Sequence, residues 1–139
     1  MVEPVFAAAR ILVADDDEPN VRALARVLLA GGYEHVSTTT DASELLTLYH
    51  EEQPDLILLD LHMPKRDGLA LLEELNAAAG PQNYLPVLVI TGDTSTETRR
   101  NALLAGAKDF VTKPYEMDEL LLRIRNLLET RRLHREIVS

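Results

Sequence analysis

The sequence predicts an α/β domain built on a doubly wound, five-stranded parallel sheet flanked by five helices. Three observations support this fold class. Short apolar runs of strand length alternate with amphipathic stretches that have a helical period. The apolar runs are continuous, which is typical of strands covered on both faces. The 139 residues, of which 46% are hydrophobic and 27% charged, suffice for one domain with a sizeable core.

The first half of the chain predicts two strands, each followed by a helix. Ile11–Ala14 is an apolar run that ends abruptly in acidic residues. An amphipathic helix follows, and Gly31-Gly32 ends it. The segment 35–40, rich in Thr and Val, predicts a weaker strand. Asp41 is a candidate N-cap for the second helix, which has an apolar stripe over residues 45–49.

The second half repeats this alternation three times. Leu56–Leu59 and Val87–Ile90 predict the third and fourth strands, and 109–112 predicts the fifth. An apolar helical stripe follows each of them, and Thr96 is a candidate N-cap of the fourth helix. The last helix has the clearest stripe, over residues 117–128. Because helices join parallel strands by right-handed crossovers, the sheet should be doubly wound.

Composition excludes several functional classes. The chain has no cysteine, so it has no disulfide framework, thiolate zinc site or cysteine nucleophile. No apolar window approaches the roughly 18 residues of a membrane span, and no signal peptide is visible, so we expect a cytoplasmic protein without a membrane partner. The net charge of −9 disfavours nucleic acid as a direct partner of this segment. Residues 123–139 are the exception, with five arginines and two glutamates.

Polar residues follow four of the predicted strands. They are Asp15, Asp16 and Asp17 after the first strand, Asp60 after the third, Thr91 after the fourth and Lys113 after the fifth. In a doubly wound sheet, ligands bind beyond the carboxyl ends of the strands. Converging carboxylates repel one another, and a hard divalent cation such as Mg²⁺ relieves that repulsion. A lysine and a hydroxyl beside them are suited to stabilising a transferring phosphoryl group.

Each of these residues also has a purely structural interpretation. An acidic run after a strand is often a helix N-cap cluster, and a single Asp at a strand end is usually a turn residue. Thr91-Gly92-Asp93 reads equally well as a turn. The combination favours a site, because four different strands each end in a residue of the required type.

The motifs resemble the receiver domain of two-component response regulators, which has a flavodoxin-like fold. The resemblance covers residues 9–130 in the expected order. The segments that carry it are ILVADDDEPN at 11–20, LLDLHMPKRDG at 58–68, VITG at 89–92 and FVTKPY at 110–115.

The resemblance implies a role for each matching residue. Asp60 accepts a phosphoryl group from a sensor histidine kinase or phosphotransfer protein and forms an acyl phosphate. Thr91 and Lys113 contact the phosphoryl oxygens, and Phe110 occupies the switch position, where its ring moves inward. Mg²⁺ is the implied cofactor, and its ligands are Asp15, Asp16, Asp60 and the backbone carbonyl of His62.

Further expectations concern the surroundings of the site. The resemblance implies a cis bond before Pro114, an open approach beside Gly92, and an unusual backbone geometry at Gly68. It leaves Asp17 outside the metal site. The His62 side chain is either a solvent-exposed loop residue or an influence on the phosphoryl lifetime.

Three functions compete on this evidence. The preferred one is a signalling switch that catalyses only its own phosphorylation and dephosphorylation. The second is a phosphatase of the haloacid-dehalogenase kind. Those enzymes have an Asp-x-Asp motif at the nucleophile, whereas the residue two positions after Asp60 is His62, and no cap-sized insertion is present. The third is a degenerate receiver that only binds proteins, although all five site residues are intact: Asp15, Asp16, Asp60, Thr91 and Lys113.

Residues 131–139 are expected to form a helical linker toward a missing output domain. Arg131, Arg132 and Arg135 cannot be buried unpaired, so the last helix should leave the domain body near Glu129. Its end would be ordered by the same helix of a second subunit, by the output domain or by an effector protein. The alternative is a frayed terminus of a complete regulator. The longer tail Leu120–Glu136 is similar to the linkers that lead from receivers into cyclic-dinucleotide phosphodiesterases of the HD-GYP class and other enzymatic outputs.

Overall fold

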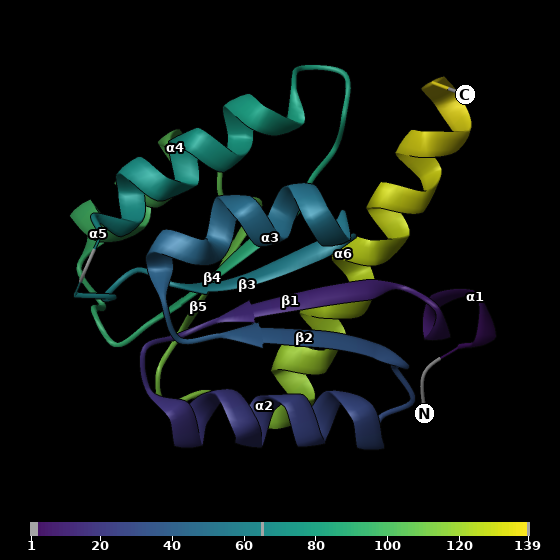
Figure 1. Ribbon diagram of the computed structural model, residues 1–139, viewed down its shortest axis with the longest axis horizontal. Coiled ribbons are helices and arrows are strands. Elements are labelled where there is room, and N and C mark those ends of the chain that lie inside the picture. The colour runs from purple at the N-terminus through teal and green to yellow at the C-terminus, as the bar shows by residue number, and fades with distance from the viewer. Residues whose placement is uncertain (1–2, 65, 139) are drawn as a thin grey trace.

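A five-stranded parallel sheet lies between two layers of helices in the computed structural model, which describes residues 3–64 and 66–138 (Figure 1). The strand order is β2-β1-β3-β4-β5, which is the predicted doubly wound arrangement. The strands are β1 (Arg10–Ala14), β2 (His35–Thr39), β3 (Leu56–Asp60), β4 (Val87–Thr91) and β5 (Asp109–Thr112).

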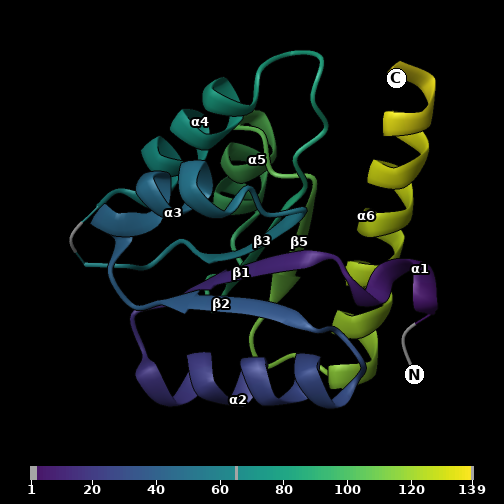
Figure 2. The same ribbon diagram turned by 45° about the vertical axis from the view of Figure 1, so that its right-hand side comes forward.

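The helices divide between the two faces of the sheet (Figures 1 and 2). Helices α3, α4 and α5 cover one face, and α2 and α6 cover the other. The helices are α1 (Pro4–Ala7), α2 (Glu18–Ala30), α3 (Leu45–Glu52), α4 (Gly68–Ala79), α5 (Thr96–Leu104) and α6 (Met117–Val138), with a single 3₁₀ turn at Ala42–Glu44 before α3.

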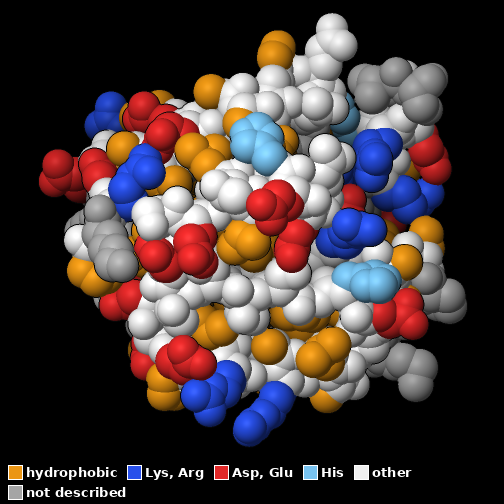
Figure 3. All heavy atoms as spheres, viewed as in Figure 1, with side chains coloured by type: hydrophobic (Ala, Val, Ile, Leu, Met, Phe, Trp, Pro, Cys, Tyr) orange, Lys and Arg blue, Asp and Glu red, His pale blue; other side chains and the backbone are white. Residues whose placement is uncertain are grey.

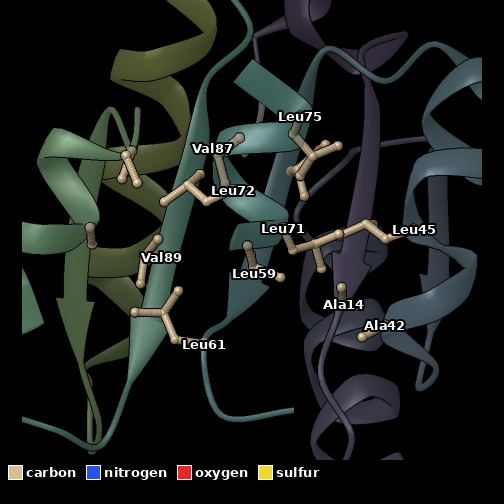
Figure 4. Packing of buried hydrophobic residues seen from close by; sticks show 14 of the residues in the cluster. Ala14, Ala42, Leu45, Leu59, Leu61, Leu71, Leu72, Leu75, Val87 and Val89 are labelled. Atoms are coloured by element: carbon tan, nitrogen blue, oxygen red, sulfur yellow. The ribbon is translucent and has the colours of Figure 1, made fainter. Parts of the chain in front are cut away.

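Alternate residues of the central strands enter two separate cores. In β1, Leu12 and Ala14 face α3 and α4, whereas Ile11 and Val13 face α2 and α6. Figure 4 shows the first core, where Leu59 of β3 lies close to Leu71 of α4. Every residue of β3 and β4 is buried. Burial on both faces is the physical reason why these strands appear in the sequence as continuous apolar runs.

Helix ends follow local sequence signals, with one correction. Gly31 ends α2, as predicted, and Gly32 next to it has a φ of 113°. The N-cap of α5 is Ser95 and not Thr96, because the Ser95 hydroxyl accepts the hydrogen bond of the Thr98 N–H at 3.1 Å. The five helices expected to flank the sheet are α2 to α6, and the described residues add the short α1, which no strong sequence pattern indicates.

Helix α6 stays on the domain body beyond the point where we expected it to leave. It runs without a break to Val138, and Arg131 bonds the Asp55 carboxylate at 3.0 Å. The expected departure near Glu129 is therefore wrong. The premise that the arginine needs a partner was sound, but the body itself supplies that partner. Ser139 lies outside the described residues. None of the described helices has the length and apolar character needed to cross a bilayer.

Candidate functional site

The predicted polar residues gather at one edge of the sheet, where the parallel strands end. Register pairs Ala14 of β1 with Leu59 of β3, so Asp15 and Asp60 lie beside each other. Thr91 ends β4, and Lys113 follows β5 directly. The Lys113 N–H donates to the Thr91 carbonyl at 2.7 Å, which extends the pairing of these two strands by one residue into the site.

The Lys113 ammonium joins the two buried carboxylates. Its Nζ lies 3.2 Å from Asp15 Oδ2 and 3.1 Å from Asp60 Oδ2. Asp15 and Asp60 are buried, and the lysine side chain is about one quarter exposed. Such charge-assisted bonds in a partly desolvated pocket hold all three side chains in one arrangement.

Backbone N–H groups hold the second oxygen of each carboxylate. Asp15 Oδ1 accepts a hydrogen bond from the Asp17 N–H at 3.0 Å, and Asp60 Oδ1 accepts one from the His62 N–H at 2.9 Å. Each aspartate thus bonds the backbone two residues later, which is an Asx turn. These turns fix the orientation of both carboxylates at the ends of their strands.

For both Asp15 and Lys113, burial and the ion pairs between them have opposing effects on the pKa. Burial raises the pKa of Asp15, and the nearby Asp60 charge adds to this, while the Asp17 N–H and Lys113 oppose it. Desolvation acts to lower the pKa of Lys113. The bonds to Asp60 and Asp15, together with their charges, outweigh it and raise that pKa. The lysine is therefore cationic at neutral pH.

The acidic residues form a group that fits a hard divalent cation. Asp15, Asp16 and Asp60 each offer a carboxylate oxygen, and these three atoms lie within 4.8 Å of one another. Asp16 is exposed, which leaves room for the waters that Mg²⁺ usually retains. One lysine offsets only part of the charge of three carboxylates. Asp17 does not belong to this group, and its side chain is exposed.

Thr91 and Phe110, the two residues of the predicted switch, are both buried. Thr91 is fully buried, and its hydroxyl accepts a hydrogen bond from the Asp93 N–H at 3.2 Å. The Phe110 ring is already buried, in the core under α3, α4 and α5. The Arg99 guanidinium of α5 lies over this ring, 5.6 Å from its centroid.

The other motif residues lie in or beside the loops around the site. The Lys113-Pro114 bond is cis, as expected. The His62 side chain is exposed. The expectation for Gly68 is wrong in its reason: its φ is not positive, but a Cβ there would lie 2.4 Å from the Leu61 carbonyl oxygen. A Cβ at Gly92 would meet nothing within 4 Å.

Sequence reasoning missed two residues near the site. Asp93 bonds Thr91 through its N–H and caps the start of α5 through its carboxylate, which accepts from Ser95 and Thr98. Arg99 covers Phe110. The Asp-x-Ser spacing of a capping segment could have indicated Asp93. No local signal could have indicated Arg99, because its partner Phe110 lies in another element, β5.

Comparison with known proteins agrees with this geometry. Residues 11–125 match the family described as "Response regulator receiver domain". The transcriptional regulatory protein PrrA of Mycobacterium leprae is 38% identical over 125 residues, which cover 90% of this chain and 52% of PrrA. The response regulator MprA of Mycobacterium tuberculosis is 40% identical over 121 residues, covering 87% of this chain and 51% of MprA.

Solved structures share the fold. A CheY-like receiver domain from Methanospirillum hungatei is 30% identical with a TM-score of 0.82, covering 90% of this chain and 97% of that one. NtrX from Brucella abortus is 38% identical with a TM-score of 0.84, covering 94% of this chain and 29% of NtrX. The phosphatase interpretation is therefore wrong. The chain belongs to the response-regulator receiver domain family.

Proposed function

We propose that the chain is the phosphoacceptor switch of a two-component system. Asp60 receives a phosphoryl group from a histidine kinase or a phosphotransfer protein in a Mg²⁺-dependent reaction. The observation that carries this proposal is the Lys113 ammonium, which bonds Asp60 at 3.1 Å and Asp15 at 3.2 Å beside the third carboxylate of Asp16. Two buried carboxylates sharing one cation are arranged for charge neutralisation at a single point.

The chemistry follows from the positions of these groups. An Asp60 oxygen attacks the phosphorus atom, the bond from phosphorus to the donor nitrogen breaks, and its electron pair returns to the donor imidazole. Lys113 neutralises negative charge on the phosphoryl oxygens. Asp15, Asp16, Asp60 and the His62 carbonyl would hold Mg²⁺, which when bound neutralises further charge. Hydrolysis reverses the modification, as water attacks phosphorus and the Asp60 carboxylate leaves.

The switch depends on contacts that differ between the two states. In the unmodified protein, the Thr91 hydroxyl bonds the Asp93 N–H. A phosphoryl group on Asp60 offers Thr91 a stronger, charged acceptor. Drawing Thr91 toward it frees the Asp93 N–H and shifts the start of α5 relative to Phe110. The affected surface is formed by α5, β5 and α6, and a partner that recognises it would read the state.

The proposed partners extend beyond this segment. The chain spans about half the length of the curated relatives that it matches. We propose that residues 9–130 are the receiver and that 131–139 lead toward an output domain or effector protein. A homodimer through α6 is the simplest further assembly. The acidic receiver is not the part that contacts nucleic acid, and a kinase partner implies a cytoplasmic protein.

Labelling with acetyl phosphate and Mg²⁺ tests the acceptor. Intact mass should rise by about 80 Da, the mass of one phosphoryl group, in the wild type and not in Asp60→Asn. Asp67→Asn is the matched control, since Asp67 is the exposed N-cap of α4 on the same loop. Labelling of Asp60→Asn at the wild-type rate would place the acceptor elsewhere. Absence of labelling in the wild type would favour a degenerate receiver.

The Thr91→Ala variant tests the switch separately. Beryllofluoride should still bind, but NMR shifts over α5, β5 and α6 should become much smaller than in the wild type. Shifts of equal size in both proteins would show that Thr91 does not carry the coupling.

A further inference from the structure

The opposite edge of the sheet carries a second polar cluster that the receiver chemistry does not use. At its centre is Asp55, in the loop before β3. Its carboxylate accepts hydrogen bonds from Arg131 at 3.0 Å and from Arg135 at 3.3 Å, both on α6. We call Asp55, Arg131, Arg135 and the Tyr84 carbonyl the Asp55 clamp. Figure 3 shows basic side chains gathered at the right, where α6 ends in the same view of Figure 1.

Arg131 makes the strongest contacts of the Asp55 clamp. Its Nε bonds Asp55, and its second nitrogen donates to the Tyr84 carbonyl at 2.5 Å. Its side chain is only 16% exposed and that of Asp55 only 22%. One guanidinium therefore joins α6 to two loops of the body, the one before β3 and the one before β4. The His134 ring packs against Tyr84 with the centroids 5.9 Å apart, which adds an apolar contact one turn further on.

Asp55 is itself fixed to the sheet. Its N–H donates to the Arg10 carbonyl at 2.7 Å, and its Oδ2 accepts from the Arg10 N–H at 2.9 Å. Arg10 opens β1, which pairs with β3 in the centre of the sheet. The residue that holds the end of α6 is thus bonded in turn to the first residue of a central strand.

In the described part of α6, the side chains beyond Arg132 contribute little apolar burial. Among its last described side chains, Leu133 and Ile137 are 45% and 82% exposed. A segment as short as 131–138 does not form a stable helix in water by itself. Arg132 bonds Glu129 and Glu136, which lie on α6 itself, so these two pairs do not attach the helix to the body.

We propose that the Asp55 clamp docks the last two turns of α6 on the receiver body and thereby fixes the direction in which this helix leaves the domain. The docking surface is the edge of the sheet opposite Asp60, and its occupant is the segment 131–138 of this same chain. The clamp is already formed in the unmodified protein, so it does not depend on Asp60 being a phosphoacceptor.

Hydrogen–deuterium exchange of the segment 131–138 in the unmodified 139-residue chain tests this proposal. Arg131→Gln and Asp55→Asn should each speed exchange there about tenfold, the effect expected from losing a charge-assisted bond. Combining the two should add little, because both remove the same interaction. Arg132→Gln, which removes the same charge from the same turn, should change exchange by less than about twofold.

Two outcomes would overturn the Asp55 clamp. One is exchange in Arg131→Gln equal to the wild type, and the other is an equal increase in Arg132→Gln. Exchange in β3 serves as the internal reference, so that global destabilisation of Asp55→Asn is recognised. Acetyl phosphate labelling of Asp60 should be unchanged in Arg131→Gln. A failure of labelling in every protein, with the exchange pattern intact, would reject the proposed function and keep the clamp.

The absence of cysteine permits a second, direct measurement. Spin labels at Glu73→Cys, on the exposed side of α4, and at Ile137→Cys should give one narrow distance distribution. Arg131→Gln should broaden it, since the end of α6 would then sample several directions. An equally narrow distribution in both proteins would show that the clamp does not set the direction of the helix.

Discussion

At the scale of single residues, the charge balance of the site depends on Lys113. Its ammonium lies between two buried carboxylates, where a divalent cation would be attracted by the same charges. The lysine therefore has two opposite effects. Under the proposed function, it would stabilise the phosphoryl group in transfer, and it would weaken the attraction of the metal-free site for Mg²⁺ by like-charge repulsion.

Lys113→Met should separate these two effects. Phosphorylation by acetyl phosphate should slow about a hundredfold, as expected when a charged contact to a transferring group is removed. Mg²⁺ should bind several times more tightly, because the competing cation is gone. Calorimetry measures the Mg²⁺ affinity. Lys108→Met is the control, because the Lys108 ammonium lies over the Tyr84 ring and not in the site. Weaker Mg²⁺ binding in Lys113→Met would mean that the lysine shapes the pocket rather than competing in it.

The raised pKa of Asp15 predicts how the site responds to pH. Since burial raises this pKa above the ordinary value of 3.8, the ionised carboxylate opposes folding at neutral pH. That penalty is relieved as the pH falls through the raised pKa toward 3.8. A proton and Mg²⁺ compete for the same oxygen, so Mg²⁺ affinity should fall over this window in calorimetric titrations. Affinity that stays constant there would exclude Asp15 from the ligands.

The residues of the site differ in how far the sequence could predict them. Asp15, Asp60 and Thr91 follow apolar runs, and a parallel sheet brings such ends together. The Arg99 contact with Phe110 and the Arg131 contact with Asp55 could not be predicted in this way. Each joins side chains that are distant in the sequence, and their pairing depends on rotamers that only the packed structure selects.

At the scale of elements, the start of α5 shows how local chemistry sets a boundary. Ser95 and Thr96 are both residues that favour an N-cap, and the sequence does not distinguish them. In the structure, Asp93 bonds the Ser95 N–H and places the Ser95 hydroxyl beside the Thr98 N–H. The boundary therefore depends on the turn that follows β4, which is why the sequence interpretation was wrong by one residue.

Ser95→Ala should lower the free energy of unfolding by about 1 kcal/mol, the usual effect of removing an N-cap. Thr96→Ala should change it by less than about 0.5 kcal/mol, because Thr96 is the first residue inside the helix and makes no cap. Urea denaturation at neutral pH measures both. Equal losses in the two variants would show that the cap is shared or misassigned.

The strands were predicted more reliably than the helices for a physical reason. A strand buried on both faces needs apolar residues at every position, so β3 and β4 stand out in the sequence. The short α1 has no such signal. It is held by tertiary contacts, since the buried Phe6 packs in the core under α2 and α6.

At the scale of the whole molecule, ligand binding at the acidic edge should stabilise the entire fold. A ligand that binds only the folded state raises the free energy of unfolding by mass action. Mg²⁺ at about ten times its dissociation constant should add about 1.4 kcal/mol in urea denaturation. Asp16→Asn should lose most of this gain, and Asp17→Asn should keep it. An equal Mg²⁺-dependent increase in the free energy of unfolding in both variants would show that Asp16 does not bind the metal.

Helix α6 runs from one edge of the sheet to the other: it starts close to Lys113, and its last two turns bond Asp55. Its 22 residues make a rod about 33 Å long. Once the Asp55 clamp is released, such a rod would act as a lever arm: a rotation of about 10° at its start would move its far end by about 6 Å, simply from its length. Any domain joined there would be displaced by a distance comparable to a full helical turn, although the atoms at the origin of the motion shift by only a fraction of that.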